Sequence, residues 1–333
     1  MNLKVSVIIP VYNGTAFVGK ALDSVLRQDY PAHEVIVIDD GSTDSTPELL
    51  KGYGDRLIVR RIQNSGASNA RNIGMAMATG DALAFLDHDD VWFRNKLKVQ
   101  TEMFGRYPQA GLVSCNYAVR AHHLKGRMLN HFSALQNLKE MNFNEPLKRP
   151  AFVLLVKENF IGTPSAVLIK KELSDAVGKL SDAHRPSEDY EYWLRCAVRA
   201  NFVLISQMLF YKRTHATNLS NDVLKIQTSH KKVMVDTFRL EKAYIRSNKF
   251  SSLCSSELAR HNYLLGTLYF EKGDARKAFG LYKEGLKASA SPYNVLMFLW
   301  ILLKKGLRVL SGEKISRKSY RMFRRSLGER RRQ

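Results

Sequence analysis

ALAFLDHDD, residues 82–90, is the most informative stretch of the sequence. Five apolar residues run directly into three carboxylates, Asp87, Asp89 and Asp90. A short continuous apolar run is typical of a strand covered on both faces. Carboxylates crowded at the end of such a strand repel one another and resist the loss of water, and a divalent cation removes both problems. The stretch therefore predicts a Mg²⁺ or Mn²⁺ site that holds a diphosphate, with a polar helix-capping turn as the alternative.

Strand and helix patterns alternate on both sides of this stretch. Apolar runs predict strands over residues 5–9, 34–38, 57–62, 82–86, 110–119, 166–169 and 202–211. Helical spacing predicts helices over residues 15–28, 43–53, 67–78 and 92–107. Further helices are predicted to begin near residues 171 and 186, and the chain is predicted to be helical from residue 223 onward. This alternation indicates an α/β fold built from βαβ units with a mostly parallel sheet. Ligands of such sheets bind at the carboxyl ends of the strands, where the chain carries its polar clusters. The segment 120–160 has no readable period.

Charge is high and unevenly placed. The 333 residues carry a formal net charge of +21, and residues 304–333 hold 12 Lys and Arg against two Glu. A basic tail predicts an anionic partner, which is nucleic acid, anionic lipid, or only solvent and counterions. The three cysteines form neither a metal pattern nor a disulfide framework, so we expect a reducing compartment.

Two features stand out in the helical region after residue 221. One tetratricopeptide-like helix pair is predicted from Leu265, Gly266, Tyr269, Ala278 and Tyr282, and a lone copy favours a packing appendage over a peptide-binding array. Residues 293–303 are too short an apolar run to span a bilayer but suit an interfacial helix, and the alternative is a buried helix with a solvated tail. We expect domains at 1–220 and 221–310, followed by a basic tail at 311–333.

Five segments resemble glycosyltransferase family 2. They are VSVIIPVYNG (5–14), VIVIDDGSTD (35–44), NSGASNARNIGMAMATGD (64–81), AFLDHDD (84–90) and PSEDYEYWLR (186–195), in the family's order and spacing. The resemblance covers about two thirds of the chain. It implies a GT-A fold, in which a nucleotide-binding half is joined to an acceptor-binding half. It also implies metal-dependent transfer of a sugar from a nucleotide-diphosphate donor, UDP before GDP or dTDP, with inversion at the anomeric carbon.

The resemblance assigns residues to the donor and the metal. It places seven residues at the nucleotide and donor sugar, namely Pro10, Tyr12, Asn13, Asp39, Asp40, Arg71 and Asp87. A ring such as Tyr12 can stack on a base, and a carboxylate such as Asp40 suits the N3–H of uracil. For the metal it implies Asp89, with Asp87 and His215 completing the shell. Asp90 is expected to support these ligands without binding the metal itself, and His88 is given no catalytic role.

The segment 186–195 carries the expected base. Inversion requires a group that deprotonates the attacking hydroxyl, and the resemblance points to Asp189, oriented by Glu188. The positive end of the helix is expected to keep Asp189 ionised, which makes it a weak but well-placed base. The alternative for the pair is helix capping. Trp193 lies on the same helical face, where it would either stack on a sugar or belong to the core.

The resemblance and the tail together indicate the reaction's setting. The Gln-x-x-Arg-Trp motif of processive members is absent, which favours transfer of a single sugar. The acceptor is expected to be a hydroxyl of a glycan or lipid-linked molecule in cell-envelope polysaccharide synthesis. The protein is expected in the cytoplasm, on the anionic cytoplasmic face of the inner membrane.

Two rival functions remain. A sugar nucleotidyltransferase would need a glycine-rich loop with a basic residue after the first strand, where this chain has Tyr12, Asn13 and Gly14. A basic membrane- or nucleic-acid-binding protein with a degenerate transferase domain would leave the acidic residues unexplained. Nucleic acid is not expected as a partner, because the basic residues are not interleaved with regular aromatics.

Overall fold

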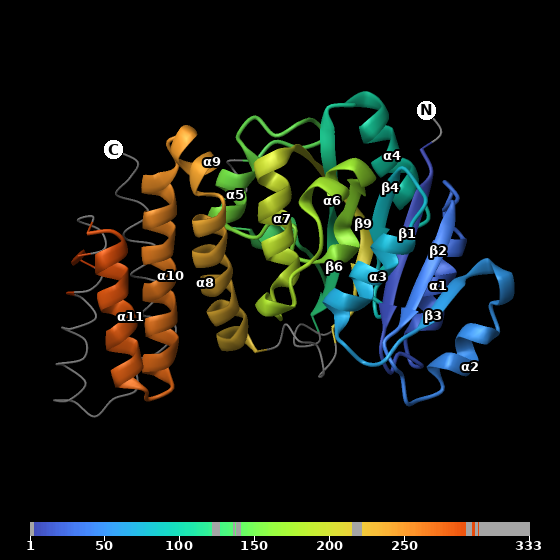
Figure 1. Cartoon of the computed structure of the whole chain (residues 1–333), viewed down its shortest axis with the longest axis horizontal. Coiled ribbons are helices and arrows are strands. Elements are labelled where there is room, and N and C mark those ends of the chain that lie inside the picture. Colours follow the sequence, from blue (N-terminus) through green and yellow to red (C-terminus); the bar gives the residue numbers. More distant parts are fainter. Residues whose placement is uncertain are drawn as a thin grey trace. The chain divides into compact units, whose positions relative to one another are not determined.

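The computed structural model describes residues 3–121, 127–135, 137, 141–214, 222–290, 295, 296 and 299. Internal contacts divide the chain into two compact units, residues 1–258 and 259–333. The first unit is built around one mixed β-sheet, and Figure 1 labels most of its strands. The described part of the second unit is helical.

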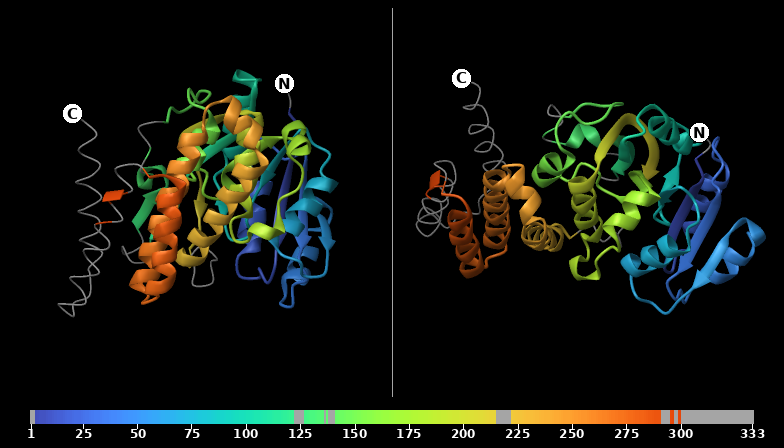
Figure 2. Two further views of the ribbon diagram at one scale, coloured as in Figure 1. Left: turned by 60° about the vertical axis from the view of Figure 1, so that its left-hand side comes forward. Right: turned by 45° about the horizontal axis from the view of Figure 1, so that its top comes forward.

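The N-terminal half of the sheet is parallel, as the sequence predicts. Its strands are β1 (Val5–Val11), β2 (Glu34–Asp39), β3 (Ile58–Arg61) and β4 (Ala82–Phe85), in the order β3-β2-β1-β4. All seven residues of β1 are buried, because helices cover both faces of the sheet (Figure 2). The connecting helices are α1 (Val18–Leu26), α2 (Thr46–Lys51) and α3 (Ala67–Met77), and α3 packs on β1 and β2.

The other half of the sheet changes direction at β8. Strand β8 (Val167–Lys170) runs antiparallel to β4, β6 (Ala110–Ala121) runs antiparallel to β8, and β9 (Asn201–Lys212) runs parallel to β6. Three elements were not predicted, namely β5 (Val91–Trp92), β7 (Arg127–Asn130) and α5 (Ala151–Lys157). β5 has two residues, and the other two elements are short pieces of a segment in which no hydrophobic period develops.

Further helices belong to this half of the first unit. They are α4 (Lys96–Arg106), α6 (Lys171–Val177), α7 (Glu188–Arg199), α8 (Val223–Leu240) and α9 (Lys242–Ser247). Helix α7 is enclosed by α5, α6 and α8, and its Tyr192 and Trp193 are almost completely buried. The core thereby fixes the position of the Glu188–Asp189 pair at the start of α7.

The repeat-like spacing correctly predicts a helix pair. Helix α10 (Ser251–Glu271) crosses the boundary between the units, and α11 (Ala275–Ala288) follows it. Asp274 caps α11 by accepting the Lys277 N–H at 3.0 Å, and the rings of Tyr263 and Tyr282 stack with centroids 6.1 Å apart.

The predicted interfacial helix and the basic tail lie outside the described residues, except for Val295, Leu296 and Leu299, whose side chains are exposed. Where the structure describes the chain, it contains no helix that is both long and apolar enough to cross a membrane.

Candidate active site

Three polar clusters meet at one edge of the sheet. In the parallel register, Val11 at the end of β1 lies opposite Asp39 at the end of β2, and Ile8 lies opposite Phe85 at the end of β4. The residues that directly follow β1, β2 and β4 therefore share the carboxyl edge, as the sequence predicts.

Tyr12 and Asn13 follow β1 in different ways. The Tyr12 side chain is 44% exposed, so its ring is available for stacking on a base. Asn13 has a φ of +50° and ties two loops together, because its N–H donates to Ser42 Oγ and its Oδ1 accepts the Thr43 N–H. Pro10 is buried inside β1.

Asp40 holds the turn that opens α3. Its two carboxylate oxygens accept the N–H groups of Ser65 at 2.7 Å and Gly66 at 2.8 Å. Gly66 has a φ of +93°, which only glycine adopts readily. A carboxylate offers about four lone-pair positions, so Asp40 keeps acceptor capacity for a ligand N–H. Asp39 instead closes its own turn by accepting the Ser42 N–H, and it lies 3.4 Å from Arg61 Nε.

Arg71 of α3 contacts carboxylates from both halves of the first unit. Its Nη2 lies 2.6 Å from Asp87 Oδ1, and its Nη1 lies 3.3 Å from Glu188 Oε1. The side chain is nearly buried. Burial alone would lower the pKa of Arg71, but Asp87 and Glu188 raise it. The acidic loop after β4 and the start of α7 are thus joined through one guanidinium.

The loop before β8, which carries Thr163 and Ser165, also binds Asp87. Asp87 Oδ2 accepts a hydrogen bond from Thr163 Oγ1 at 3.1 Å, and the Asp87 N–H donates to Ser165 Oγ. Burial would raise the pKa of Asp87, but Arg71 outweighs it and lowers the pKa. Asp87 is therefore an ionised, fully oriented carboxylate. The contacts of Thr163 and Ser165 with Asp87 were not predicted, because they join residues more than 70 positions apart in the chain.

The remaining carboxylates of the loop fit a cation. Asp90 Oδ1 accepts the Arg213 N–H, while its buried Oδ2 has no hydrogen-bond partner in the described structure. Burial, Asp87 and Asp89 raise the pKa of Asp90 well above its usual value. Carboxylate oxygens crowded in this way are the ligands that Mg²⁺ and Mn²⁺ prefer.

No set of three protein ligands is complete in the part of the chain that the structure describes, and the predicted ligand His215 lies outside it. Protein sites for Mg²⁺ supply one or two carboxylates and leave the rest to substrate phosphates and water. Asp89 therefore remains the predicted main ligand, with phosphates of the donor as its natural complement.

Asp189 differs from its predicted state. Burial and, next, the neighbouring Glu188 raise the pKa of Asp189 to about 7, so the expectation that the helix end keeps it strongly acidic was wrong. Loss of water and a like charge outweigh the helix dipole, which contributes less. A carboxyl group that titrates near neutral pH is a better base than an ordinary aspartate. Glu188 Oε2 is buried and has no hydrogen-bond partner within the described residues.

Lys212 is a member of the cluster that the sequence analysis missed. It ends β9, opposite Val119 of β6. Burial would lower the pKa of Lys212, but Tyr117, Asp90 and the other carboxylates of the cluster raise it. The pairing of β5 with β9 places Val91 opposite Tyr211 and so brings Lys212 to the acidic loop, and no local motif could have indicated it.

Two other predictions concern side chains near this cluster. Trp193 belongs to the core, because it is 1% exposed and meets Phe85 edge to face, and it does not face a sugar site. The His88 ring lies beside Gly14 in the loop after β1, away from the Arg71 contacts.

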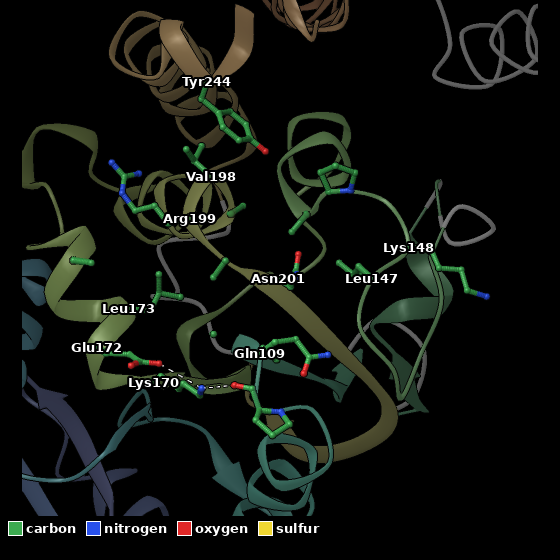
Figure 3. Close-up of a pocket in the computed structure, with 18 residues that line it drawn as sticks. Gln109, Leu147, Lys148, Lys170, Glu172, Leu173, Val198, Arg199, Asn201 and Tyr244 are labelled. Atoms are coloured by element: carbon green, nitrogen blue, oxygen red, sulfur yellow. Dashed lines mark hydrogen bonds and ion pairs between the residues drawn. The ribbon is translucent and has the colours of Figure 1, made fainter. Parts of the chain in front are cut away.

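A cavity of about 800 Å³ lies elsewhere in the first unit (Figure 3). Its lining comes from the start of β6, the segment joining α7 to β9, and α6, and it includes Tyr244 of α9. It contains none of the predicted site residues.

Comparison with known proteins decides the family. The sequence model described as Glycosyl transferase family 2 matches residues 6–177, just over half of the chain. The chain belongs to glycosyltransferase family 2. An uncharacterised glycosyltransferase of Rickettsia prowazekii is 28% identical over 66% of this chain and 67% of its own length. A Bacillus subtilis protein, TuaG, named for teichuronic acid biosynthesis, is 43% identical over 29% of this chain and 40% of its own length.

Solved structures share the fold of this glycosyltransferase. S. aureus TarS 1–349 in complex with UDP-GlcNAc superposes with a TM-score of 0.63 at 20% identity, over 86% of this chain and 81% of that one. This chain spans 49% of a longer TarS chain. The mannosyltransferase PcManGT of Pyrobaculum calidifontis, in complex with GDP-Man and Mn²⁺, has a TM-score of 0.55 at 18% identity, over 93% and 88% of the two chains. The fold is thus of the predicted GT-A type.

Proposed function

We propose that this glycosyltransferase moves a single sugar, with inversion, from a nucleotide-diphosphate donor to a hydroxyl group, and that it needs Mg²⁺ or Mn²⁺. One observation carries the proposal. Arg71 bonds to Asp87 of the acidic loop and to Glu188 of α7, so both carboxylates meet at one guanidinium. A sugar held between them is open to a hydroxyl from the side of Asp189.

Each part of the cleft has a role in this proposal. Tyr12 stacks on the base, and Asp40 accepts its N–H. Asp89 holds the cation, which neutralises the diphosphate as it leaves. Asp189 takes the proton of the attacking hydroxyl, and a pKa of about 7 lets it do so near neutral pH. Asp87 and Glu188 are positioned by Arg71 and keep these groups in place.

The donor is proposed to be a UDP-sugar. Asp40 retains a lone pair for the uracil N3–H, and TarS, which shares the fold, was solved with UDP-GlcNAc. A GDP-sugar is the next candidate, since PcManGT was solved with GDP-Man.

The acceptor is proposed to be a glycan or a lipid-linked molecule of the cell envelope. The name of the B. subtilis relative and the +10 charge of residues 304–333 support this choice. Anionic lipid attracts each basic residue near its surface by about 1 kcal/mol. The full chain should therefore float with anionic liposomes and a chain ending at 292 should not, and equal flotation would remove the membrane role.

A thermal-shift panel of nucleotide sugars tests the proposal. A ligand that binds only the folded state raises the melting temperature. We expect one UDP- or GDP-sugar to raise it with Mn²⁺, and EDTA or Asp89→Asn to abolish the shift. Asp55→Asn, an exposed carboxylate on η1 (Gly54–Arg56), is the matched control. No shift with any nucleotide sugar would refute the function, and release of pyrophosphate from UTP and a sugar phosphate would indicate a nucleotidyltransferase.

A further inference from the structure

Arg185 is an arginine of the acceptor half that reaches the nucleotide half. It lies between η6 (Asp182–His184) and the start of α7. Its guanidinium covers Gly66, because a methyl group placed on Gly66 would lie 2.8 Å from Arg185 Nη1 and 3.5 Å from its Cζ. Gly66 is the residue whose N–H is bound by Asp40. Arg185 therefore stands beside the turn where the base is proposed to bind.

The backbone that carries Arg185 is firmly anchored. The preceding His184 has its Nε2 3.0 Å from Asp236 Oδ2 of α8, and its carbonyl accepts hydrogen bonds from Ser229 Oγ and the Ser187 N–H. The turn is thus tied both to α8 and to the helix that presents Asp189.

The guanidinium itself is uncommitted. The Arg185 side chain is exposed, and it forms no hydrogen bond or ion pair with any residue that the structure describes. Its five N–H donors remain available to a ligand, and arginine offers no acceptor. An arginine with free donors on an anchored turn beside the proposed base site is suited to bind a group of the ligand.

We propose that Arg185 determines nucleotide specificity by donating to a carbonyl oxygen of the base while Asp40 accepts the neighbouring ring N–H. Uracil and guanine carry such a carbonyl beside an N–H. Cytosine and adenine carry an amino group beside a ring nitrogen that has no hydrogen. The amino group, a donor, would then face the donors of Arg185, and the ring nitrogen, an acceptor, would face the acceptor Asp40. The pair therefore selects keto bases against amino bases. This inference rests on the proposed function, because it requires the base at Asp40.

UDP and CDP form the sharpest test, because they differ only at this edge of the base. Their affinities for the full chain are measured by calorimetry with Mn²⁺, for the wild type and Arg185→Gln, with GDP and ADP as a second pair. We expect the wild type to prefer the keto nucleotide. Arg185→Gln should reduce that preference at least about fivefold by weakening the keto nucleotide and leaving the amino one unchanged. Arg106→Gln, at an exposed arginine of α4, is the matched control and should leave the preference intact.

Three other outcomes would overturn the inference. Equal weakening of UDP and CDP, steepest at low salt, would make Arg185 a phosphate contact. An unchanged preference in Arg185→Gln, together with its loss in Asp40→Asn, would leave the proposed function standing and remove Arg185 from base recognition. A wild type that binds none of the four nucleotides would overturn the proposed function itself.

Discussion

Arg71 Nη2 lies 2.6 Å from Asp87 Oδ1, and this ion pair joins α3 to the acidic loop after β4. The same guanidinium reaches Glu188 at 3.3 Å, so one cation serves two carboxylates that come from different elements. A nearly buried arginine with two such partners cannot be replaced without leaving charge unpaired.

Arg71→Ala should therefore destabilise the fold. Removing one partner of a buried ion pair costs about 3–5 kcal/mol, since the remaining charges stay desolvated. Arg94→Ala is a matched control, because Arg94 pairs with Asp29 at 3.3 Å on an exposed surface, where a pair contributes about 1 kcal/mol or less. Urea unfolding of both variants measures the difference. Similar losses in the two would mean that the buried network contributes no special stability.

The rate should rise with pH through neutrality. Asp189 must be ionised to accept a proton, and its pKa is raised to about 7. The profile of kcat/KM should therefore show an ascending limb with an apparent pKa near 7, because this quantity reports the free enzyme. A profile that is flat from about pH 5.5 upward would show that the base has an ordinary carboxylate pKa or lies elsewhere.

The contribution of Asp90 to the stability of the fold should fall as pH rises. Its native pKa lies above the unfolded value of 3.8, so the native state holds the proton more tightly than the unfolded chain. The associated stabilisation is complete below the unfolded pKa and is lost as pH rises through the native pKa. Asp90→Asn removes this term, so without metal its stability relative to wild type should increase with pH.

Urea titrations at several pH values, in EDTA, measure this effect, with Asp55→Asn as the control. A constant difference between wild type and Asp90→Asn across pH would show that Asp90 is ionised in the native protein.

Tyr12→Ala should weaken nucleotide binding without unfolding the protein. Stacking of a base on an aromatic ring contributes about 1–3 kcal/mol. The ring is 44% exposed, so its loss should change stability by no more than about 0.5 kcal/mol. Calorimetry with UDP or GDP measures the loss, and Tyr12→Phe should retain most of the affinity. Unaltered affinity in Tyr12→Ala would place the base away from this ring.

Much of the fold could be predicted from sequence because β1, β2 and β4 are short apolar runs. Strands β1, β2 and β4 are buried throughout or nearly so, and the polar residues that follow them gather at one edge, as parallel pairing requires. The antiparallel direction of β8 was not predicted, because the direction of a strand depends on the strand it pairs with and cannot be read from its own residues.

The candidate site divides in a similar way. Asp40, Asp87 and Asp189 could be proposed from sequence because they stand shortly after strands or at a helix start. The place of Lys212 was not predicted, because its partners Tyr117 and Asp90 are far away in the chain. The raised pKa of Asp189 was not predicted either, because it depends first on burial, which the residue's neighbours in sequence do not reveal.

Donor turnover by Asp189→Asn is the most direct test of the whole account. Release of nucleoside diphosphate from the donor found in the panel is followed in wild type and in this variant, and donor affinity is measured in both. We predict donor affinity within about twofold and turnover lower by at least about a hundredfold, which is the usual loss when a general base is removed. Turnover within about threefold of wild type would contradict the claim that Asp189 activates the acceptor across the cleft from the acidic loop.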